Sequence, residues 1–243
     1  MKKQCIVLSV LCCASTVLAA PSFYVAPNTY PSYSADHDLA WQGAVGGFGE
    51  LDFDNLPQGT YVDSFFDVYM GVDVFVGLGG SGAAVEVYNS TWSAPDSGSM
   101  YGTVHANALL NRSAAGAVAS TVAFTFSTPV TGFGAWLFDN NRASLESMVM
   151  TVEEVGGGVT QSPLLESGNP DIHFVEGFLG VTSDVGLTSV AFSLIDGATG
   201  GLSSRFMEID HVQVAAPIPA PGAVLLGGLG AGLVGWLRRR RSL

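Results

Sequence analysis

Short runs of alternating hydrophobic and polar residues dominate this chain of 243 residues from about residue 50 onward. In TVAFTFS, Val122, Phe124 and Phe126 occupy one phase and Thr or Ser the other, as in a strand with one buried face. Clusters of Gly, Pro, Asn and Asp separate the runs, with no long helical periodicity between them. The pattern predicts an all-β antiparallel sandwich over residues 50–214. Its strands are expected at residues 50–55, 72–77, 83–89, 102–110, 117–127, 132–139, 144–154, 171–181, 186–196 and 205–215.

Residues 20–49 precede this domain and contain one short predicted helix. The first part of this segment is rich in Pro, Ser and Tyr and is expected to be extended. Ser34 can then cap a helix whose first turn holds Asp36 and Asp38, where acidic side chains favour the helix dipole. The glycine pair that follows residue 45 is expected to end the helix. Its apolar stripe is expected to consist of Leu39, Ala40, Ala44 and Val45.

Residues 1–19 have the pattern of a secretory signal peptide. Two lysines precede an apolar core over residues 6–18, which is too short for a membrane-spanning helix. Small residues follow, and we expect cleavage after Ala19, because a cut after Ala20 would place Pro21 at the scissile bond. The chain is therefore expected to be exported, with signal peptidase as its first partner.

An uncharged apolar run, Ala223–Leu237, lies near the other end of the chain and is followed by four arginines. As a helix the run spans about 22 Å, less than the hydrocarbon core of a bilayer, so the arginines can reach the headgroups. Because positive flanks stay in the cytoplasm, we expect a transmembrane helix over residues 223–243 with the larger domain outside. Residues 215–222 are rich in proline and are expected to form an extended spacer.

The charge and cysteine content argue against nucleic-acid binding and against stabilisation by disulfides. Between the two terminal segments only Arg112, Arg142 and Arg205 are basic, against all 21 acidic residues. Such an acidic surface repels nucleic acid, so we expect no nucleic-acid partner. All three cysteines lie in the signal peptide, so the exported part has no disulfide and must be stabilised by its core.

The proline motif, short apolar helix and terminal arginine cluster together resemble the PEP-CTERM class of bacterial sorting signals. In detail they are similar to the variant named for Val-Pro-Leu-Pro-Ala, with Ala216 in the place of the valine and Ala220 in that of the parent motif's glutamate. The resemblance implies processing by an exosortase in the inner membrane of a Gram-negative bacterium, then transfer to the cell surface or extracellular matrix. The residues of this motif are Pro217, Pro219, Ala220, Pro221, Gly222, Arg238, Arg239, Arg240 and Arg241.

The domain itself also resembles the ectodomains of this class. The segment LDFDNLPQGTYVDSFFDVYMGVDVF is similar to their entry, and FLGVTSDVGLTSVAFSL followed by FMEIDHVQV is similar to their exit. The family ends in Ile-Asp-Asp-Val, where this chain has His211 at the third position. The resemblance implies a jelly-roll-like sandwich similar to galactose-binding or carbohydrate-binding modules.

Two acidic groups at opposite ends of the domain are candidate ligands of a structural Ca²⁺ ion. Glu50, Asp52 and Asp54 share one face of the first predicted strand, and Glu208 and Asp210 lie in the last. The hydrophobic phase of the last strand switches, which predicts a bulge beside Asp210. In jelly rolls the first and last strands commonly run side by side, so the two groups can meet and supply hard oxygen ligands. The alternative is two solvated strand faces. No other cofactor is expected.

Six aromatic residues are weighed as sugar-stacking groups: Phe65, Phe66, Tyr69, Trp92, Tyr101 and Trp136. Most are expected in the core, because a sandwich of this size needs large buried side chains. Trp92 and Tyr101 are the predicted ligand-binding residues, since NSTWSAPDSGSMYG is polar and loop-like.

The expected function is that of a non-enzymatic cell-surface or matrix protein with a lectin-like sandwich that binds polysaccharide or calcium. No catalytic residue is predicted, because the four histidines lack the spacing of metal-dependent hydrolases and Ser81 lacks the setting of a hydrolase nucleophile. Two alternatives stay open: an enzyme that acts on polysaccharide through paired carboxylates, and a purely structural matrix protein.

The sorting hypothesis predicts where the chain ends in the cell. Intact mass spectrometry of the protein isolated from its host should give a chain that stops between Pro219 and Gly222 and begins at Ala20. A chain that keeps its C-terminal arginines and stays in the membrane would contradict the hypothesis.

Overall fold

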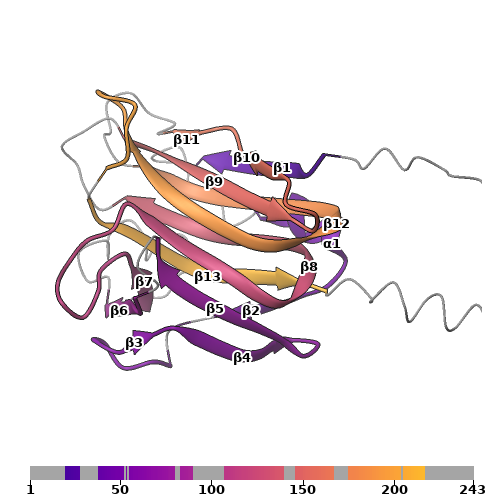
Figure 1. Cartoon of the computed structure of the whole chain (residues 1–243), viewed down its shortest axis with the longest axis horizontal. Coiled ribbons are helices and arrows are strands. Elements are labelled where there is room, and N and C mark those ends of the chain that lie inside the picture. The colour runs from indigo at the N-terminus through magenta and orange to yellow at the C-terminus, as the bar shows by residue number, and fades with distance from the viewer. Residues whose placement is uncertain are drawn as a thin grey trace, which may run out of the picture.

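The computed structural model describes residues 20–27, 38–51, 53, 55–79, 83–89, 107–139, 146–166, 175–203 and 205–216. Within them the chain forms thirteen strands, all paired antiparallel, and one short helix (Figure 1), which confirms the all-β class. The elements are β1 (Ser22–Pro27), α1 (Leu39–Val45), β2 (Phe48–Leu51), β3 (Tyr61–Val62), β4 (Ser64–Tyr69), β5 (Val72–Leu78), β6 (Val85–Asn89), β7 (Asn107–Leu110), β8 (Thr121–Asp139), β9 (Glu146–Glu154), β10 (Val159–Gln161), β11 (Leu165–Glu166), β12 (Glu176–Asp196) and β13 (Met207–Ala215).

The two longest strands, β8 and β12, pair with each other and pass from one layer of the fold to the other. Layer 1 holds β1, the first part of β12 (176–182), the second part of β8 (132–139), β13, β2, β7, β6 and β3. Layer 2 holds β4, β5, the first part of β8 (121–130), the second part of β12 (187–196), β9, β10 and β11.

Aromatic packing shows how sharply β8 bends between the layers. Phe124 and Phe133 are nine residues apart, a separation of about 30 Å along a straight strand. Their ring centroids nevertheless lie 5.1 Å apart, and Phe192 of β12 lies 6.0 Å from Phe133. These rings belong to the main hydrophobic core, which both layers enclose. The inward phase predicted for Val122 and Phe124 is confirmed, since both are fully buried.

Helix α1 covers the outer face of layer 1 mainly through Trp41, which is fully buried, and Val45 packs against the same cluster. The indole Nε1 donates a hydrogen bond to the carbonyl oxygen of Val181, at 2.9 Å. A Cβ atom at Gly180 would lie 2.6 Å from Trp41 Cδ1, so the ring fits only over a glycine. Trp41, Trp136, Phe178 and Ala215 form a second, smaller hydrophobic cluster beneath the helix.

The expected apolar stripe of this helix is wrong for three of its four residues, and the fourth, Val45, packs against the cluster. Leu39 is 53% exposed, Ala40 and Ala44 are also exposed, and Val45 is half-buried. The helix has only seven residues and meets the sheet mainly through a single large ring, so it has no continuous apolar face.

The role expected for Asp38 is also wrong. Asp38 occupies the N-cap position, but its side chain makes no capping hydrogen bond and no acidic residue lies in the first turn. Its carboxylate is buried and accepts hydrogen bonds from the amides of Gln42 (2.7 Å) and Gln213 of β13 (2.8 Å). Asp38 therefore ties the start of α1 to layer 1.

The strand boundaries differ from the prediction in four places. The expected lead-in contains β1, which pairs with β12 from Ser22↔Thr182 to Pro27↔Gly177. β3 and β4 lie between the predicted strands 50–55 and 72–77, and β10 and β11 lie between the predicted strands 144–154 and 171–181. Two pairs of predicted strands are continuous in the structure: 117–127 and 132–139 form β8, and 171–181 and 186–196 form β12.

Among the described residues no helix is long and apolar enough to cross a bilayer. The predicted signal peptide and transmembrane helix lie outside those residues.

Trp41→Ala should lower the free energy of unfolding by about 3–5 kcal/mol, because it removes a fully buried ring and opens a cavity. Leu39→Ala is the matched control on the same helix and should change stability by less than about 0.5 kcal/mol, because Leu39 is exposed. Urea unfolding of the full-length chain in detergent measures the stability of both variants. It should be followed by far-ultraviolet circular dichroism, which reports the backbone and not the Trp41 side chain. Equal effects would show that α1 is not docked as described.

Candidate functional site

The exposed aromatic side chain of Phe75 marks a candidate binding site on the outer face of layer 2. Along β5 the side chains alternate strictly: Val72, Val74, Val76 and Leu78 are buried in the core, and Phe75 between them is 42% exposed. The ring thus lies on a strand whose opposite face is anchored in the core. An aromatic side chain held in this way is rigid and presents a flat apolar face to solvent.

Hydroxyl side chains extend the row that contains Phe75 across three neighbouring strands. The strand register places Ser64 of β4 and Thr125 of β8 on either side of Phe75, and Ser189 of β12 beside Thr125. Cross-strand neighbours on one face lie about 5 Å apart, so these four residues form one continuous row.

Small residues form the next row. Gly77 of β5 pairs with Ala123 of β8, and Ala123 pairs with Ala191 of β12. The side chains at these three positions are at most a methyl group. The surface is therefore recessed between the row of Phe75 and the row of Thr121 and Ser193 on its other side. We call this low strip, floored by Gly77, Ala123 and Ala191, the trough.

Thr121 and Ser193 form the other wall of the trough, and their hydroxyl oxygens are hydrogen-bonded at 2.8 Å. The two walls are four residues apart along the strands, which corresponds to about 13 Å. The trough therefore runs across the strands, and its second wall is less accessible than its first, because Ser193 is 8% exposed.

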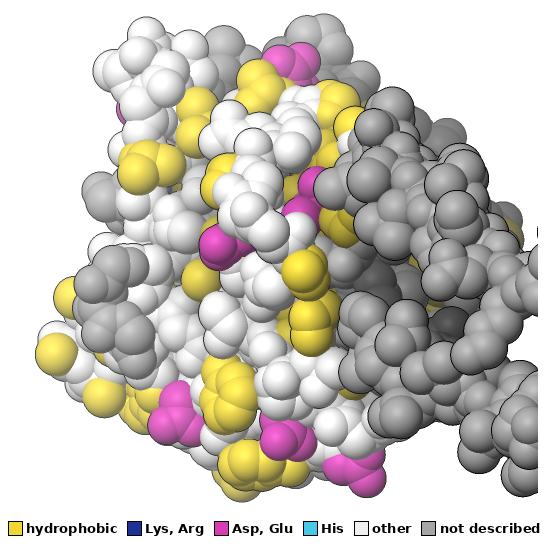
Figure 2. Space-filling view, turned by 45° about the vertical axis from the view of Figure 1, so that its right-hand side comes forward, with side chains coloured by type: hydrophobic (Ala, Val, Ile, Leu, Met, Phe, Trp, Pro, Cys, Tyr) yellow, Lys and Arg dark blue, Asp and Glu magenta, His cyan; other side chains and the backbone are white. Residues whose placement is uncertain are grey.

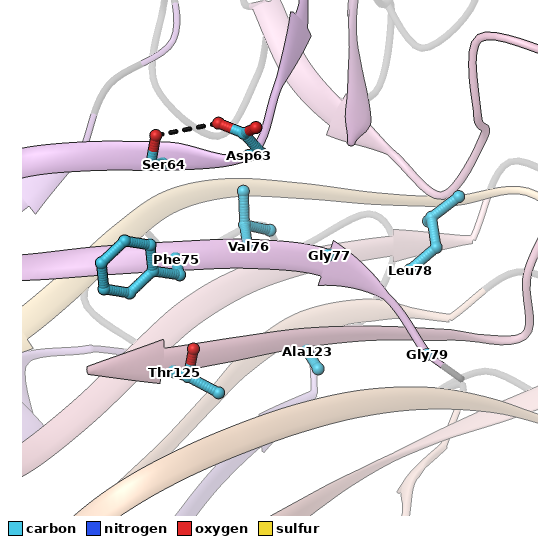
Figure 3. Close-up of a pocket in the computed structure, with 9 residues that line it drawn as sticks. All are labelled: Asp63, Ser64, Phe75, Val76, Gly77, Leu78, Gly79, Ala123 and Thr125. Carbon is cyan, nitrogen blue, oxygen red and sulfur yellow. Dashed lines mark hydrogen bonds between the residues drawn. The ribbon is translucent and has the colours of Figure 1, made fainter. Parts of the chain in front are cut away.

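A hollow of about 540 Å³ lies at the β5 end of the trough (Figure 3). Its lining comprises Asp63, Ser64, Phe75, Val76, Gly77, Leu78, Gly79, Ala123 and Thr125. The Ser64 hydroxyl donates a hydrogen bond to Asp63 Oδ1 at 2.8 Å, which holds the carboxylate beside the start of β4. Asp63 is exposed, so its second carboxylate oxygen can accept a further hydrogen bond.

The β4–β5 hairpin adds a second exposed ring, on the side of the Phe75 row that faces away from the trough. Phe65 packs against the core, so its neighbour Phe66 points outward, where it is 72% exposed. Beyond a β-bulge, Asp73 Oδ1 accepts a hydrogen bond from the backbone N–H of Asp67, at 3.0 Å. Exposed rings and carboxylates are thus neighbours on this hairpin. Along the lower edge of the face in Figure 2, carboxylates likewise lie between hydrophobic side chains.

The two arginines that the structure describes are paired with buried glutamates. Arg112 donates to both carboxylate oxygens of Glu86, and this hydrogen bonding raises the pKa of Arg112 above its ordinary value. Arg205 Nε lies 3.1 Å from Glu146 Oε1. Neither arginine lines the hollow or the trough.

The segments that hold the two acidic groups run side by side, because β2 pairs with β13, but the pairing spans Val212–Ala215 and does not reach Glu208 or Asp210. Gln213 is opposite Glu50, and the Glu50 carboxylate contacts His211 Nδ1. Glu208 and Asp210 are almost fully buried, at 1% and 3% exposure. Within the described part of the chain, no group of three or more His, Cys, Asp or Glu side chains is arranged to hold a metal ion. The other two predicted ligands, Asp52 and Asp54, lie outside that part.

The predicted bulge beside Asp210 is confirmed. The pairing of β13 with β8 shifts register between Asp210 and Gln213, and His211 has a positive φ of 44°. The backbone N–H of His211 donates to Asp210 Oδ1 at 2.7 Å, which fixes the carboxylate next to the bulge. The bulge aims the His211 ring toward Glu50 on β2.

The remaining predicted sites fall mainly outside the described residues. This applies to Trp92, Tyr101, the sorting motif from Pro217 onward and Ala19, whereas Ala20 is the first described residue. Trp136, one of the aromatic residues weighed above, is fully buried in the cluster under α1.

Phe75 is absent from the predicted ligand-binding residues, although the sequence carries a signal for it. In VDVFVGL the aliphatic residues occupy every second position, which places Phe75 in the same phase as Asp73 and Gly77. An aromatic residue in the polar phase of a strand is expected to face solvent. The row of Ser64, Thr125 and Ser189 carries no such signal, because it depends on the register between strands.

No family model and no curated protein matches the chain. Among solved structures, 70% of the chain aligns with a structure of the M60 catalytic domain with the CBM51-1 and CBM51-2 domains from Clostridium perfringens ZmpB, at 14% identity and a TM-score of 0.30. A second solved structure, from a structural analysis of an exo-beta-agarase, aligns with 71% of the chain at 13% identity and a TM-score of 0.31. The aligned parts are 15% and 26% of those two chains. Likenesses this low carry no functional argument, so function must be argued from the site.

Proposed function

We propose that this chain is an exported protein of the cell surface or extracellular matrix that binds polysaccharide along the trough of layer 2. The observation that carries the proposal is the exposed Phe75 ring in a row of hydroxyl groups, beside a strip of small residues. A sugar ring has apolar C–H faces and a rim of hydroxyl groups. Phe75 can cover one face while Ser64, Thr125 and Asp63 exchange hydrogen bonds with the rim.

The shape of the trough suits a polymer rather than a small ligand. It runs across three strands, so successive sugar units of one chain can lie along it. A small molecule is usually held in a cleft that buries most of its surface, which the described trough does not provide.

The arrangement favours binding over catalysis. Glycoside cleavage by the usual mechanisms needs two carboxyl groups on opposite sides of the bond, about 5–9.5 Å apart. Among the described residues that line the hollow, Asp63 is the single carboxylate. An enzyme that acts on polysaccharide is therefore the weaker alternative.

Export and sorting belong to the same proposal and rest on the sequence. The last strand, β13, ends at Ala215, the first residue of the predicted proline-rich spacer. A signal peptide would take the domain out of the cytoplasm, and the C-terminal helix with its arginines would hold it at the inner membrane until an exosortase acts.

Phe75→Ala should weaken binding to polysaccharide by about five- to thirty-fold, the effect of truncating an aromatic anchor. Phe75→Trp should retain binding, because it keeps an aromatic face. Affinity electrophoresis of the full-length chain in a polyoxyethylene detergent, which contains no sugar, measures both variants on gels that contain soluble polysaccharide.

Phe206→Ala is the matched control, since Phe206 is 40% exposed and immediately precedes β13 in layer 1. Its loss should leave binding unchanged. If Phe206→Ala weakens binding as much as Phe75→Ala, or if Phe75→Ala has no effect, the trough is not the binding site.

A structural calcium ion at the β2–β13 junction is the second proposal. The observation that favours it is the burial of Glu208 and Asp210 on β13, the strand that β2 joins. Carboxylate oxygens are hard ligands of the kind that Ca²⁺ prefers, and the ion takes six to eight oxygen ligands.

Millimolar Ca²⁺ should raise the melting temperature of the wild-type chain, and Asp210→Ala should abolish that increment. The increment, not the absolute melting temperature, is the readout, because Asp210→Ala also removes the acceptor of the His211 N–H. Asp184→Asn, at an exposed carboxylate in β12, is the control that should keep the increment. Absence of a calcium effect on the wild type would end the proposal.

A further inference from the structure

We propose that the trough accepts uncharged polysaccharides and discriminates against anionic ones such as uronate-containing or sulfated chains. The inference rests on the proposed function, because it names the class of polysaccharide that the same site takes. It follows from the charges placed around the trough.

Carboxylates stand at both ends of the row that contains Phe75. At the β4 end, Asp63 lines the hollow beside Ser64. At the β9 end, Glu153 is opposite Ser189, whose hydroxyl donates to Glu153 Oε2 at 3.2 Å. Both carboxylates are exposed and belong to strands or loops that are anchored in layer 2. A polymer lying in the trough therefore passes two fixed negative charges.

The hairpin beside the hollow adds further negative charge. Asp67 and Asp73 lie on β4 and β5, and their carboxylates accept backbone hydrogen bonds from Gly71 and Asp67 respectively. These bonds hold the charges in place near the exposed Phe66 ring, so an anionic group that approaches the rings meets them.

No positive charge offsets these carboxylates within the described trough. The lining of the hollow and the paired rows of β5, β8 and β12 contain no Lys, Arg or His. Outside residues 1–3 the sequence has no lysine at all. The described arginines, Arg112 and Arg205, are paired with Glu86 and Glu146. Recognition of a carboxylate or sulfate normally uses such cations, above all arginine.

The physical consequence is a difference in both affinity and salt dependence. A neutral chain loses nothing to the carboxylates and can donate hydroxyl hydrogen bonds to them. An anionic chain is repelled, and salt screens that repulsion. Binding of the neutral chain should therefore be nearly independent of ionic strength, and binding of the anionic chain should become stronger as salt is added.

Matched polymers separate charge from backbone chemistry. Hydroxyethyl cellulose and carboxymethyl cellulose share one backbone, as do dextran and dextran sulfate, and mannan extends the neutral set. Affinity electrophoresis of the full-length chain in a polyoxyethylene detergent, at low and at high salt, measures each. We expect at least one neutral polymer to bind at least about tenfold more tightly than its anionic counterpart at low salt, with the ratio falling at high salt.

A double variant, Asp63→Asn with Glu153→Gln, tests whether the named carboxylates cause the discrimination. Both side chains are exposed, and their amides keep hydrogen-bonding capacity, so the fold should be preserved. The ratio of neutral to anionic affinity should fall severalfold. Asp184→Asn with Glu166→Gln removes the same charge from exposed positions outside the trough and should leave the ratio unchanged.

The outcomes distinguish the two proposals. Equal or tighter binding of the anionic polymers overturns the inference while the proposed function stands. Equal ratios for the two double variants also overturn it, because net charge rather than the trough would then explain the preference. Absence of binding to every polymer in the set overturns the inference together with the proposed polysaccharide function.

Discussion

The antiparallel pairing of β8 with β12 is the constraint on which the rest of this structure depends. These two strands contribute to both layers, and every layer is built outward from them. Their bend brings Phe124, Phe133 and Phe192 into one cluster, so the core closes between the layers. Because the sequence has no cysteine after Cys13, this buried core must supply the stability that disulfides supply in many other proteins.

The same pairing produces the two distinct outer faces. In layer 1, Gly134 and Gly180 face each other and leave room for Phe178 and the Trp41 ring, so α1 covers that surface. In layer 2, small residues are again paired, as Ala123 with Gly77 and with Ala191, but no described element covers them. The first face is closed by a docked ring, whereas the second stays open as the trough. Cross-strand pairs of small residues therefore make room for a stabilising ring in layer 1 and, in our proposal, for a ligand in layer 2.

The sequence reveals strands more readily than their connections. β5 and the first part of β8 follow from alternation, because side chains of a strand point to opposite faces in turn. The continuity of β8 was hidden by Pro129 and Gly132, which usually mark the end of a strand but here lie at its bend. The buried face of α1 could not be predicted from periodicity, because it consists mainly of Trp41.

Features of the candidate site that lie within one strand could be predicted from the sequence, whereas features that join several strands could not. The exposure of Phe75 follows from its phase in β5, and the bulge beside Asp210 follows from a change of phase in β13. The row that joins Phe75 to Thr125 and Ser189 requires the register of three strands, which no single segment encodes. The net acidity of the chain is visible in the composition, but the positions of its carboxylates around the trough are a property of the fold.

The most direct test of the account is a map of the ligand on the protein. Amide chemical shifts of the isotope-labelled chain should be followed by nuclear magnetic resonance during titration with a neutral oligosaccharide cut from a polymer that binds. The account predicts that the largest changes lie at Phe75, Gly77, Ala123, Thr125 and Ala191, with little change around Trp41 in layer 1. Changes confined to layer 1, or spread evenly over both layers, would contradict it.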